Sequence, residues 1–146
     1  LGACEGALEA FIDVAKTRQV GPNKMKDDPF ARVLAAEVKS SIEEMKLTMI
    51  RNFDAMMASC RAGEPIAEED RVRFRYDSAV VADRCLALSG KMLKAAGSGG
   101  IRQGSELLAY HLDILASQAH VANHSIPFAN NMGAMLFGEA NADFAV

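Results

Sequence analysis

Aromatic residues are scarce in this sequence, which has no tryptophan and only 6% Phe and Tyr in 146 residues. Proline is also rare, with four residues, whereas Ala, Leu, Met, Lys and Glu are common. Strands favour aromatic and β-branched residues, and helices favour residues that lose little conformational freedom when they become helical. We therefore predict an all-α protein with almost no β-strand.

A strong excess of positive charge is absent as well. Sixteen basic residues stand against nineteen acidic ones, which gives a formal charge of −3. The one basic cluster, Arg71, Arg73 and Arg75, lies among acidic residues rather than among aromatic ones. We expect a solvated helix face with i, i+4 ion pairs from Glu69 to Arg73 and from Arg73 to Asp77. Nucleic acid is therefore not a predicted partner.

Paired cysteines and long apolar runs are missing too. Cys4, Cys60 and Cys85 are odd in number, far apart and set in apolar helical segments, so we predict reduced thiols that act as small hydrophobic residues. No disulfide or zinc pattern occurs, and no run of about 18 apolar residues suggests a membrane helix. We expect a cytoplasmic protein that does not act at a membrane.

Apolar residues recur at helical spacing in four segments, which predict helices at 1–18, 29–61, about 67–96 and 105–123. Turns rich in Gly, Pro and Asp separate them. Short connections between amphipathic helices favour an antiparallel up-down four-helix bundle. The residues expected to face the core include Leu8, Phe11, Ile12 and Ala15; Phe30, Leu34, Val38, Ile42, Met45, Met49, Phe53, Met56 and Cys60; Val72, Tyr76, Ala79, Val80, Leu86 and Leu93; and Leu108, Leu112, Leu115, Ala119 and Ala122.

The chain fits one domain, residues 1–146, with enough residues to bury a core. It opens at Leu1 without a methionine, a helix cap or a charged tail, as though a helix had been cut along its length. We therefore expect the 146 residues to be a fragment of a longer protein.

All three histidines lie towards the C-terminal end. His120 and His124 are four residues apart, the spacing of a helical zinc pair, but Val121 stands where the metalloprotease pattern has Glu, so no metal is predicted. We interpret His111 as partly buried and ordinary, and His124 as favouring the end of a helix dipole. His120 is placed in the last turns of the fourth predicted helix, just before the break at Pro127, where its side chain can reach a cavity. The alternative is a structural, hydrogen-bonded histidine.

Three other features also have two interpretations. Asp83 falls near the buried face of its helix, so it is either a satisfied acid paired with a basic neighbour or a site residue. Gly97-Ser98-Gly99-Gly100 is a helix stop that matches neither the dinucleotide nor the P-loop fingerprint. Arg18 ends the first helix, where a cation favours the dipole without binding anything.

Three stretches nevertheless match one family. The opening LGACEGALEAFIDVAKTR follows a Leu-Gly-x-Ala-x-x-Ala-Leu start that ends in Arg, and Ala96-Gly97-Ser98 fits an Ala-Gly-(Gly/Ser)-Ser loop. Asp113 is followed seven positions later by His120-Val121. Met132-Gly133-Ala134 and Phe137-Gly138 then follow at the same spacing as in the family. Together they resemble the C-terminal domain of flavin-dependent monooxygenases built on the acyl-CoA dehydrogenase fold, the two-component oxygenases that hydroxylate phenols.

The chain departs from the family pattern at four positions. The family often has Arg where this chain has Ala109, Leu112 and Ala134, and an aromatic residue where it has Met132. These differences bear on the identity of the substrate more than on the fold. The ring pocket would in any case be shared with segments that precede Leu1.

The resemblance implies a monooxygenase that hydroxylates an aromatic or phenolic substrate through a flavin hydroperoxide. It implies reduced flavin, FMN in preference to FAD, supplied by a separate flavin reductase, and a homotetramer with this bundle at its centre. Arg18 would reach the flavin phosphate of an adjacent subunit, for which its planar guanidinium is suited. The implied catalytic residue is His120, and the implied cofactor-binding residues are Arg18, Gly97, Ser98, Gly99, His120 and Val121.

The implied role of His120 is to take the phenol proton or to donate to the flavin peroxide, and either role suits an imidazole. Two alternatives remain. An acyl-CoA dehydrogenase shares the fold but needs a carboxylate base, and residues 114–138 contain no Asp or Glu. A non-catalytic bundle that serves only oligomerisation would also fit the helix pattern. The flavin bound by the full-length protein distinguishes the three. Binding of reduced flavin favours the monooxygenase, tight binding of oxidised FAD favours the dehydrogenase, and no flavin favours the non-catalytic bundle.

Overall fold

The structure is a computed structural model that describes residues 1–143. In this part of the chain the α-helices are α1 (Gly2–Thr17), α2 (Pro29–Ala62), α3 (Glu68–Ala96), α4 (Glu106–Gln118) and α5 (Ser125–Leu136). The shorter elements are the strands β1 (Gln19–Val20) and β2 (Asn23–Lys24) and the 3-10 helices η1 (Met25–Asp27), η2 (Gly97–Gly99) and η3 (Val121–Asn123). The prediction of an all-α protein is confirmed, and the two strands form only a small hairpin between α1 and α2.

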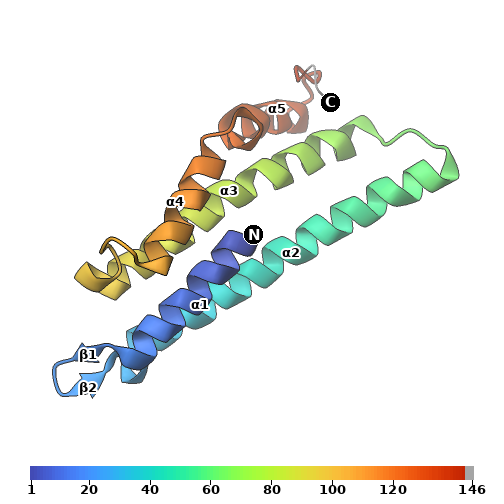
Figure 1. Cartoon of the computed structure of the whole chain (residues 1–146). Helices are drawn as coiled ribbons and strands as arrows, with labels where there is room; N and C mark the ends of the chain where they lie inside the picture. The colour runs from blue at the N-terminus through green and yellow to red at the C-terminus, as the bar shows by residue number, and fades with distance from the viewer. Residues whose placement is uncertain (144–146) are drawn as a thin grey trace.

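The first four helices alternate in direction and pack as an antiparallel bundle (Figure 1). α1 packs against α2, α3 and α4, and α3 packs against α2 and α4. α5 was not predicted; it packs along α3 and runs back towards the beginning of that helix. The side chain of Asn141, just after α5, reaches Glu68 at the start of α3, with 3.1 Å between Asn141 Nδ2 and Glu68 Oε1.

The core is centred on α1, whose small and apolar residues are covered by the other helices. Leu8, Phe11 and Ala15 are buried as predicted, and Ile12 is partly buried. Small side chains let α4 come close to α1, because a Cβ on Gly6 would stand 2.5 Å from the ring of Tyr110. The side chains buried most fully include Phe11, Ile42, Met45, Met92, Leu107, Val38, Cys4 and Ser89.

The long helix α2 begins at Pro29, as predicted. The Asp28 side chain accepts a hydrogen bond from the backbone N–H of Phe30 at 2.9 Å, and Pro29 occupies the first turn, where its missing N–H is not needed. At the other end Gly63 adopts φ +70°, which ends the helix in a left-handed conformation.

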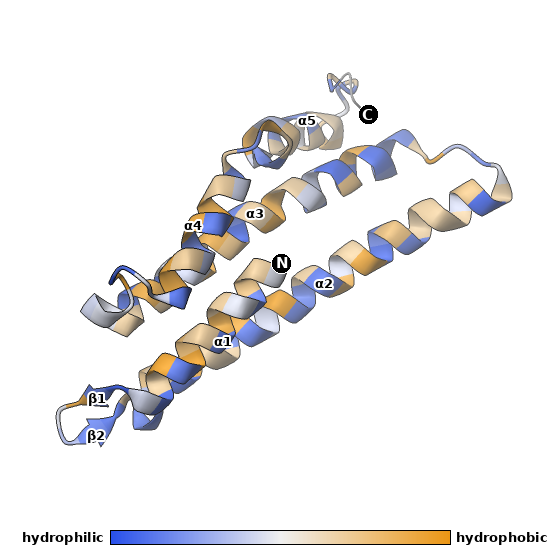
Figure 2. Ribbon diagram, viewed as in Figure 1, coloured by the Kyte–Doolittle hydropathy of each residue, from blue (hydrophilic) through white to orange (hydrophobic). Residues whose placement is uncertain are grey.

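The predicted apolar seam of α2 is buried over only part of its length. Val38, Ile42 and Met45 are buried, but Phe30 is 85% exposed and Phe53 is 53% exposed. For Phe53 the reason is length. α2 has 34 residues and spans about 51 Å, whereas the 16 residues of α1 span about 24 Å, so α1 does not cover the far half of α2 (Figures 1 and 2). Phe30 lies at the opposite end, in the first turn of α2.

The face of α4 that meets the core is not the predicted one. Leu107 and Ile114, seven residues apart, are buried, while Leu112 and Leu115 of the expected stripe are 51% and 43% exposed. α4 is apolar on more than one side, so spacing alone could not show which side faces α1 and α3.

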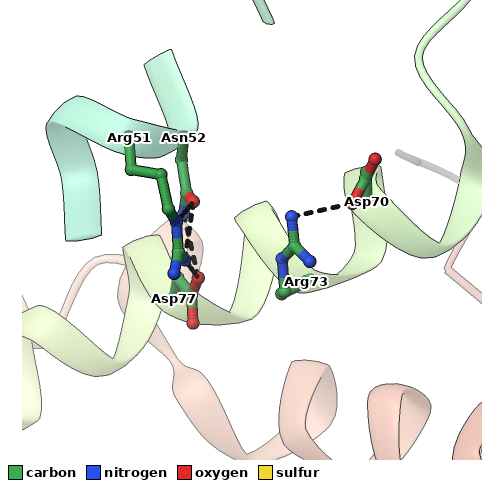
Figure 3. A network of polar contacts seen from close by, with 5 residues as sticks. All are labelled: Arg51, Asn52, Asp70, Arg73 and Asp77. Carbon is green, nitrogen blue, oxygen red and sulfur yellow. Dashed lines mark hydrogen bonds and ion pairs between the residues drawn. The ribbon is translucent and has the colours of Figure 1, made fainter. Parts of the chain in front are cut away.

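The predicted ion pairs of Arg73 are also wrong, since it bonds Asp70, one turn earlier, at 2.7 Å (Figure 3). Asp77 instead reaches across to α2, where Asn52 donates to it at 2.9 Å and Arg51 at 3.2 Å. This network joins α2 to α3 in the part of the hairpin that α1 does not cover. Among the described residues, no helix is both long and apolar enough to cross a membrane.

The cysteines divide into two kinds. Cys4 on α1 and Cys85 on α3 are buried, as predicted for thiols that pack as small hydrophobic residues, whereas Cys60 near the end of α2 is exposed. The interaction of Cys4 with the Cys85 thiol, together with burial, raises the pKa of Cys4 well above its usual value. Cys4 therefore stays protonated in the folded protein.

Candidate functional site

The ends of α1 and α3 meet at one end of the bundle and bring Arg18 next to Gly97. α1 ends at Thr17 and α3 ends at Ala96, so each residue directly follows a packed helix. A Cβ on Gly97 would stand 2.8 Å from Nη2 and 2.9 Å from Nη1 of Arg18. Only a residue without a side chain allows the guanidinium to lie this close to the loop.

The backbone of Gly97 also requires glycine. Its φ of +61° and ψ of −154° fall in a region that is essentially restricted to glycine. The following residues, Ser98 and Gly99, are exposed in the 3-10 turn η2, and a Cβ on Gly99 would meet nothing within 4 Å. The loop is therefore tight at its first glycine and open beyond it.

The guanidinium of Arg18 has unused hydrogen-bonding capacity. Its Nη1 is buried and has no hydrogen-bond partner within residues 1–143, and none of the ion pairs in that range includes Arg18. The side chain as a whole is partly exposed. A positive charge without a carboxylate partner, beside a glycine loop, is suited to an anionic group such as a phosphate.

A hollow of about 360 Å³ lies beside this loop, between α1 and the start of α4. Asp13 and Glu106 both line it, so a phosphate would be better placed against Arg18 than in the hollow itself. The lining residues are Ala10, Asp13, Val14, Thr17, Gly99, Ser105, Glu106 and Leu107.

His120 does not lie in a helix, which corrects the prediction that α4 extends to Asn123. α4 ends at Gln118, and the backbone of His120 is extended, with φ −71° and ψ 136°. The Asn123 side chain donates to the Ser117 carbonyl oxygen at 2.8 Å and so provides a partner at the helix end. Periodicity did not reveal this local side-chain bond.

The His120 ring is exposed, and one of its nitrogens is already used. Nδ1 accepts a hydrogen bond from the backbone N–H of Ala122 at 3.1 Å, which caps the short helix η3. In the neutral ring the hydrogen must then be on Nε2. His120 therefore presents a hydrogen-bond donor to the outside of the bundle.

The neighbours of His120 in the chain include exposed apolar side chains. Val121 is 78% exposed and Ile126 is 71% exposed. His124, expected in the last turn of α4, instead precedes α5 and has an exposed side chain that forms no cap bond. Pro127 was expected to end a helix, but it lies in the first turn of α5, where proline is tolerated.

His111 fits its interpretation as an ordinary, partly buried residue. Its Nδ1 lies 2.9 Å from the hydroxyl oxygen of Ser89, which is fully buried and also donates to the Leu86 carbonyl. Because Ser89 has no exposure, this pair is a packing contact between α3 and α4 rather than a reactive pair.

The predicted site residues therefore form two groups. Arg18 and Gly97 are in contact, with Ser98 and Gly99 next along the loop, while His120 and Val121 follow the opposite end of α4 (Figure 1). The 13 residues of α4 separate the two groups by about 20 Å. The hollow beside the loop is lined by Gly99 but by neither His120 nor Val121.

Asp83 has different partners from those expected. Its carboxylate accepts hydrogen bonds from Gln118 Nε2 at 3.0 Å and from the Ser125 hydroxyl, and no basic residue of the described chain pairs with it. Nothing in the local sequence around Asp83 indicates these neutral partners, because they lie 35 and 42 residues away.

A second hollow, of about 350 Å³, lies between the far half of α2 and the beginning of α3. Met49 and Met56, predicted to be core residues, line it together with Arg71, Phe74 and Arg75. Its place at the α2–α3 turn separates it from Arg18 by most of the length of that hairpin (Figure 1).

Comparisons of the sequence with known proteins agree on one family. Residues 1–125 match the family described as acyl-CoA dehydrogenase, C-terminal domain. The chain is similar to the protein named flavin-dependent monooxygenase, oxygenase subunit HsaA, with 29% identity over 126 residues for the one from Rhodococcus jostii and 32% for the one from Mycobacterium tuberculosis. Each alignment covers 84% of this chain.

Solved structures show the same similarity. The HsaA monooxygenase from M. tuberculosis superimposes with a TM-score of 0.87 at 28% identity, over 99% of this chain and 37% of that one. XiaF from Streptomyces, solved with FADH2 and glycerol, has a TM-score of 0.88 over 97% of this chain and 37% of that one, but only 17% identity, so it shows the fold alone. The chain spans about a third of the length of the HsaA proteins, 33% and 32%.

Proposed function

Because the chain belongs to the family of acyl-CoA dehydrogenase C-terminal domains, we propose that it is one domain of a longer, reduced-flavin-dependent monooxygenase that hydroxylates an aromatic or phenolic substrate. The similarity to two proteins named as oxygenase subunits of flavin-dependent monooxygenases supports this activity over dehydrogenation. The lack of any Asp or Glu between Ile114 and Gly138 supports it too, since no carboxylate base is present in that segment.

One observation in the structure carries the proposal: the unpaired guanidinium of Arg18 against Gly97. These residues fit a flavin phosphate, because Arg18 offers N–H donors and positive charge while Gly97 leaves room for close approach. Ser98 and Gly99, exposed on the same loop, would donate from a hydroxyl and from backbone N–H groups. Reduced flavin, when bound, supplies the chemistry that activates dioxygen.

Two roles were predicted for His120, proton acceptor and hydrogen-bond donor. The geometry supports the donor role. With Nδ1 accepting from Ala122 N–H, the neutral ring carries its hydrogen on Nε2 and can donate it to an oxygen atom of a substrate or cofactor. Taking a proton at Nε2 would require the hydrogen to be on Nδ1, and the bond from Ala122 would then be lost. Val121, exposed beside it, would provide an apolar contact.

The proposal includes partners that the rest of the protein would share. We infer a homotetramer with the bundle at its centre, in which Arg18 serves the flavin of an adjacent subunit, and a separate flavin reductase as the source of reduced flavin. We propose FMN in preference to FAD as the flavin. We also propose a cytoplasmic location, because the odd number of widely spaced cysteines suits a reducing compartment. Mass spectrometry of the flavin bound by the full-length protein would decide between FMN and FAD.

The test is His120→Ala in the full-length protein. We expect hydroxylation to fall by about 100-fold or more, the usual effect of losing a group that donates or accepts a proton. Binding of reduced flavin should change little, because Arg18 and its loop lie at the other end of α4. His124→Ala is the matched control, since it removes a second exposed imidazole four residues away.

Unchanged product yield in His120→Ala would remove the proposed role of His120. The nature of the bound flavin tests the rest of the proposal. Tight binding of oxidised FAD by the purified protein would favour a dehydrogenase, and no flavin binding at all would favour a non-catalytic bundle.

A further inference from the structure

One carboxylate on α3 holds both ends of the segment that carries His120. Asp83 accepts a hydrogen bond from the side chain of Gln118, the last residue of α4, at 3.0 Å. Its other oxygen accepts from the hydroxyl of Ser125, the first residue of α5. The six residues 119–124 between these two anchors form the bend that contains the short helix η3.

Burial makes these anchors stronger than surface contacts. Ser125 is only 8% exposed, and Asp83 and Gln118 are partly buried. Hydrogen bonds to an ionised carboxylate are shorter and stronger than those between neutral groups, and partial burial reduces competition from water. Since no basic residue of the described chain pairs with Asp83, its two oxygens are left to Gln118 and Ser125.

Inside the bend the bonds are local. Asn123 closes onto the Ser117 carbonyl, and His120 Nδ1 accepts from Ala122 N–H. These bonds give the bend its shape but do not attach it to the bundle. The side-chain hydrogen bonds that attach the two ends of the bend to another helix both end on Asp83.

We propose that Asp83 is a positioning residue for His120: by fixing the end of α4 and the start of α5 on α3, it sets the direction in which Nε2 points. The inference rests on the proposed role of His120. It explains why an acid lies near the buried face of α3. The carboxylate accepts from both donors at once, one on each oxygen.

The experiment compares Asp83→Ala with Asp83→Asn in the full-length protein. Asp83→Ala removes both acceptors. The asparagine keeps an acceptor for Gln118 and can donate its N–H to the Ser125 oxygen, so it should restore most of the lost function. Asp54→Ala is the control, because Asp54 is an exposed carboxylate on α2 with no hydrogen bond or ion pair among those of the described residues.

Two measurements separate positioning from general destabilisation. Amide hydrogen exchange of residues 119–124, Ala122 in particular, should become about tenfold faster in Asp83→Ala, while exchange in the buried part of α1 stays as in the wild type. In the same variant, kcat for hydroxylation should fall by about 10- to 100-fold, since small displacements of a reacting group have effects of this size. The affinity for reduced flavin should stay within about twofold.

Gln118→Ala provides a second variant that loses only one of the two bonds, in case Asp83→Ala does not fold. It should show the same selective exchange at 119–124, to a smaller extent. Wild-type exchange and wild-type kcat in both variants would overturn the inference, and so would an increase in exchange spread evenly over the bundle. If His120→Ala is active, the proposed role of His120 fails, but the exchange data still show whether Asp83 holds the bend.

Discussion

Gly97 shows how a single residue can determine the geometry of a site. Its backbone conformation, φ +61° and ψ −154°, is accessible to glycine and costs other residues about 1–3 kcal/mol. Its missing side chain leaves the space that the Arg18 guanidinium occupies. Two independent constraints therefore require glycine at the same position.

We expect Gly97→Ala to lower the free energy of unfolding by about 1–3 kcal/mol, because the new Cβ would strain the backbone and push Arg18 away. It should also weaken binding of reduced flavin in the full-length protein. Urea unfolding and flavin titration would measure the two effects. Gly2→Ala is the control, because a Cβ there would meet nothing within 4 Å and Gly2 lies outside the proposed flavin loop. Flavin binding weakened equally in both variants would contradict the role of Gly97.

For single residues, the sequence showed which positions are unusual better than it showed which partners they contact. Arg18 and Gly97 were both proposed from the family resemblance, and the structure places them in contact. Asp83 was recognised as unusual, but its partners were wrong, since a polar residue near a buried face does not reveal whether its partner is charged or neutral. Hydrogen bonds between distant segments depend on how the helices are rotated, which no local pattern gives.

Among the helices, the contact between α1 and α4 depends on small side chains. A Cβ on Gly6 would stand 2.5, 2.6 and 2.9 Å from three ring atoms of Tyr110, which itself packs on the core. The ring is partly buried, so it would have to move from its place on the core to make room for a Cβ. The closeness of these two helices therefore requires the absence of a side chain at position 6.

Gly6→Ala should destabilise the bundle by about 1–3 kcal/mol through overpacking, even though alanine is the better helix former. Gly2→Ala, on the same helix but with nothing within 4 Å of the new Cβ, should be neutral or slightly stabilising. Thermal or urea unfolding of both variants would test this. Combining Gly6→Ala with Tyr110→Leu should recover part of the loss, and a Gly6→Ala protein as stable as the wild type would show that α4 can shift at no cost.

Helix starts were easier to predict than helix ends. Asp28-Pro29 placed the first residue of α2 correctly, because a cap and a proline act within two residues of each other. The end of α4 was placed five residues too late, since the apolar spacing continues through Ala119 and Ala122 after the backbone has left the helix. Pro127 was interpreted as the residue that breaks the fourth helix, although the first turn of a new helix also accepts proline.

At the scale of the molecule, the described residues include an uncovered apolar stripe on α2. On the far half of α2, apolar side chains recur every three or four residues and are 49–67% exposed: Leu47, Ile50, Phe53 and Met57. A helix that presents such a stripe is suited to packing against another helix. The stripe supports the proposed homotetramer, in which a second copy would cover it.

We expect Ile50→Glu to reduce the mass of the full-length assembly in sedimentation velocity, because an unpaired carboxylate in an apolar interface costs several kcal/mol. Val20→Glu, which alters an apolar residue of similar exposure in the β1–β2 hairpin, serves as the control. An unchanged mass for Ile50→Glu would mean that the subunits associate through another surface.

The overall architecture could be predicted from the composition and from the helical spacing of apolar residues. Which parts of each helix are covered and which are exposed could not. Four helices of the right type were predicted because their amphipathic periods are long and regular. The exposed far half of α2 has the same period as its buried half, so its sequence alone does not show where α1 stops. That boundary depends on the lengths of neighbouring helices.

The separation of Arg18 from His120 by the length of α4 has a genetic consequence. If Arg18 of one subunit and His120 of another serve the same flavin, then Arg18→Ala and His120→Ala each inactivate every site in a pure assembly. Co-expressed in equal amounts, the two inactive proteins would rebuild about a quarter of the sites by random assortment of subunits. The two alleles would then complement each other, as two lesions in one active site confined to a single chain do not.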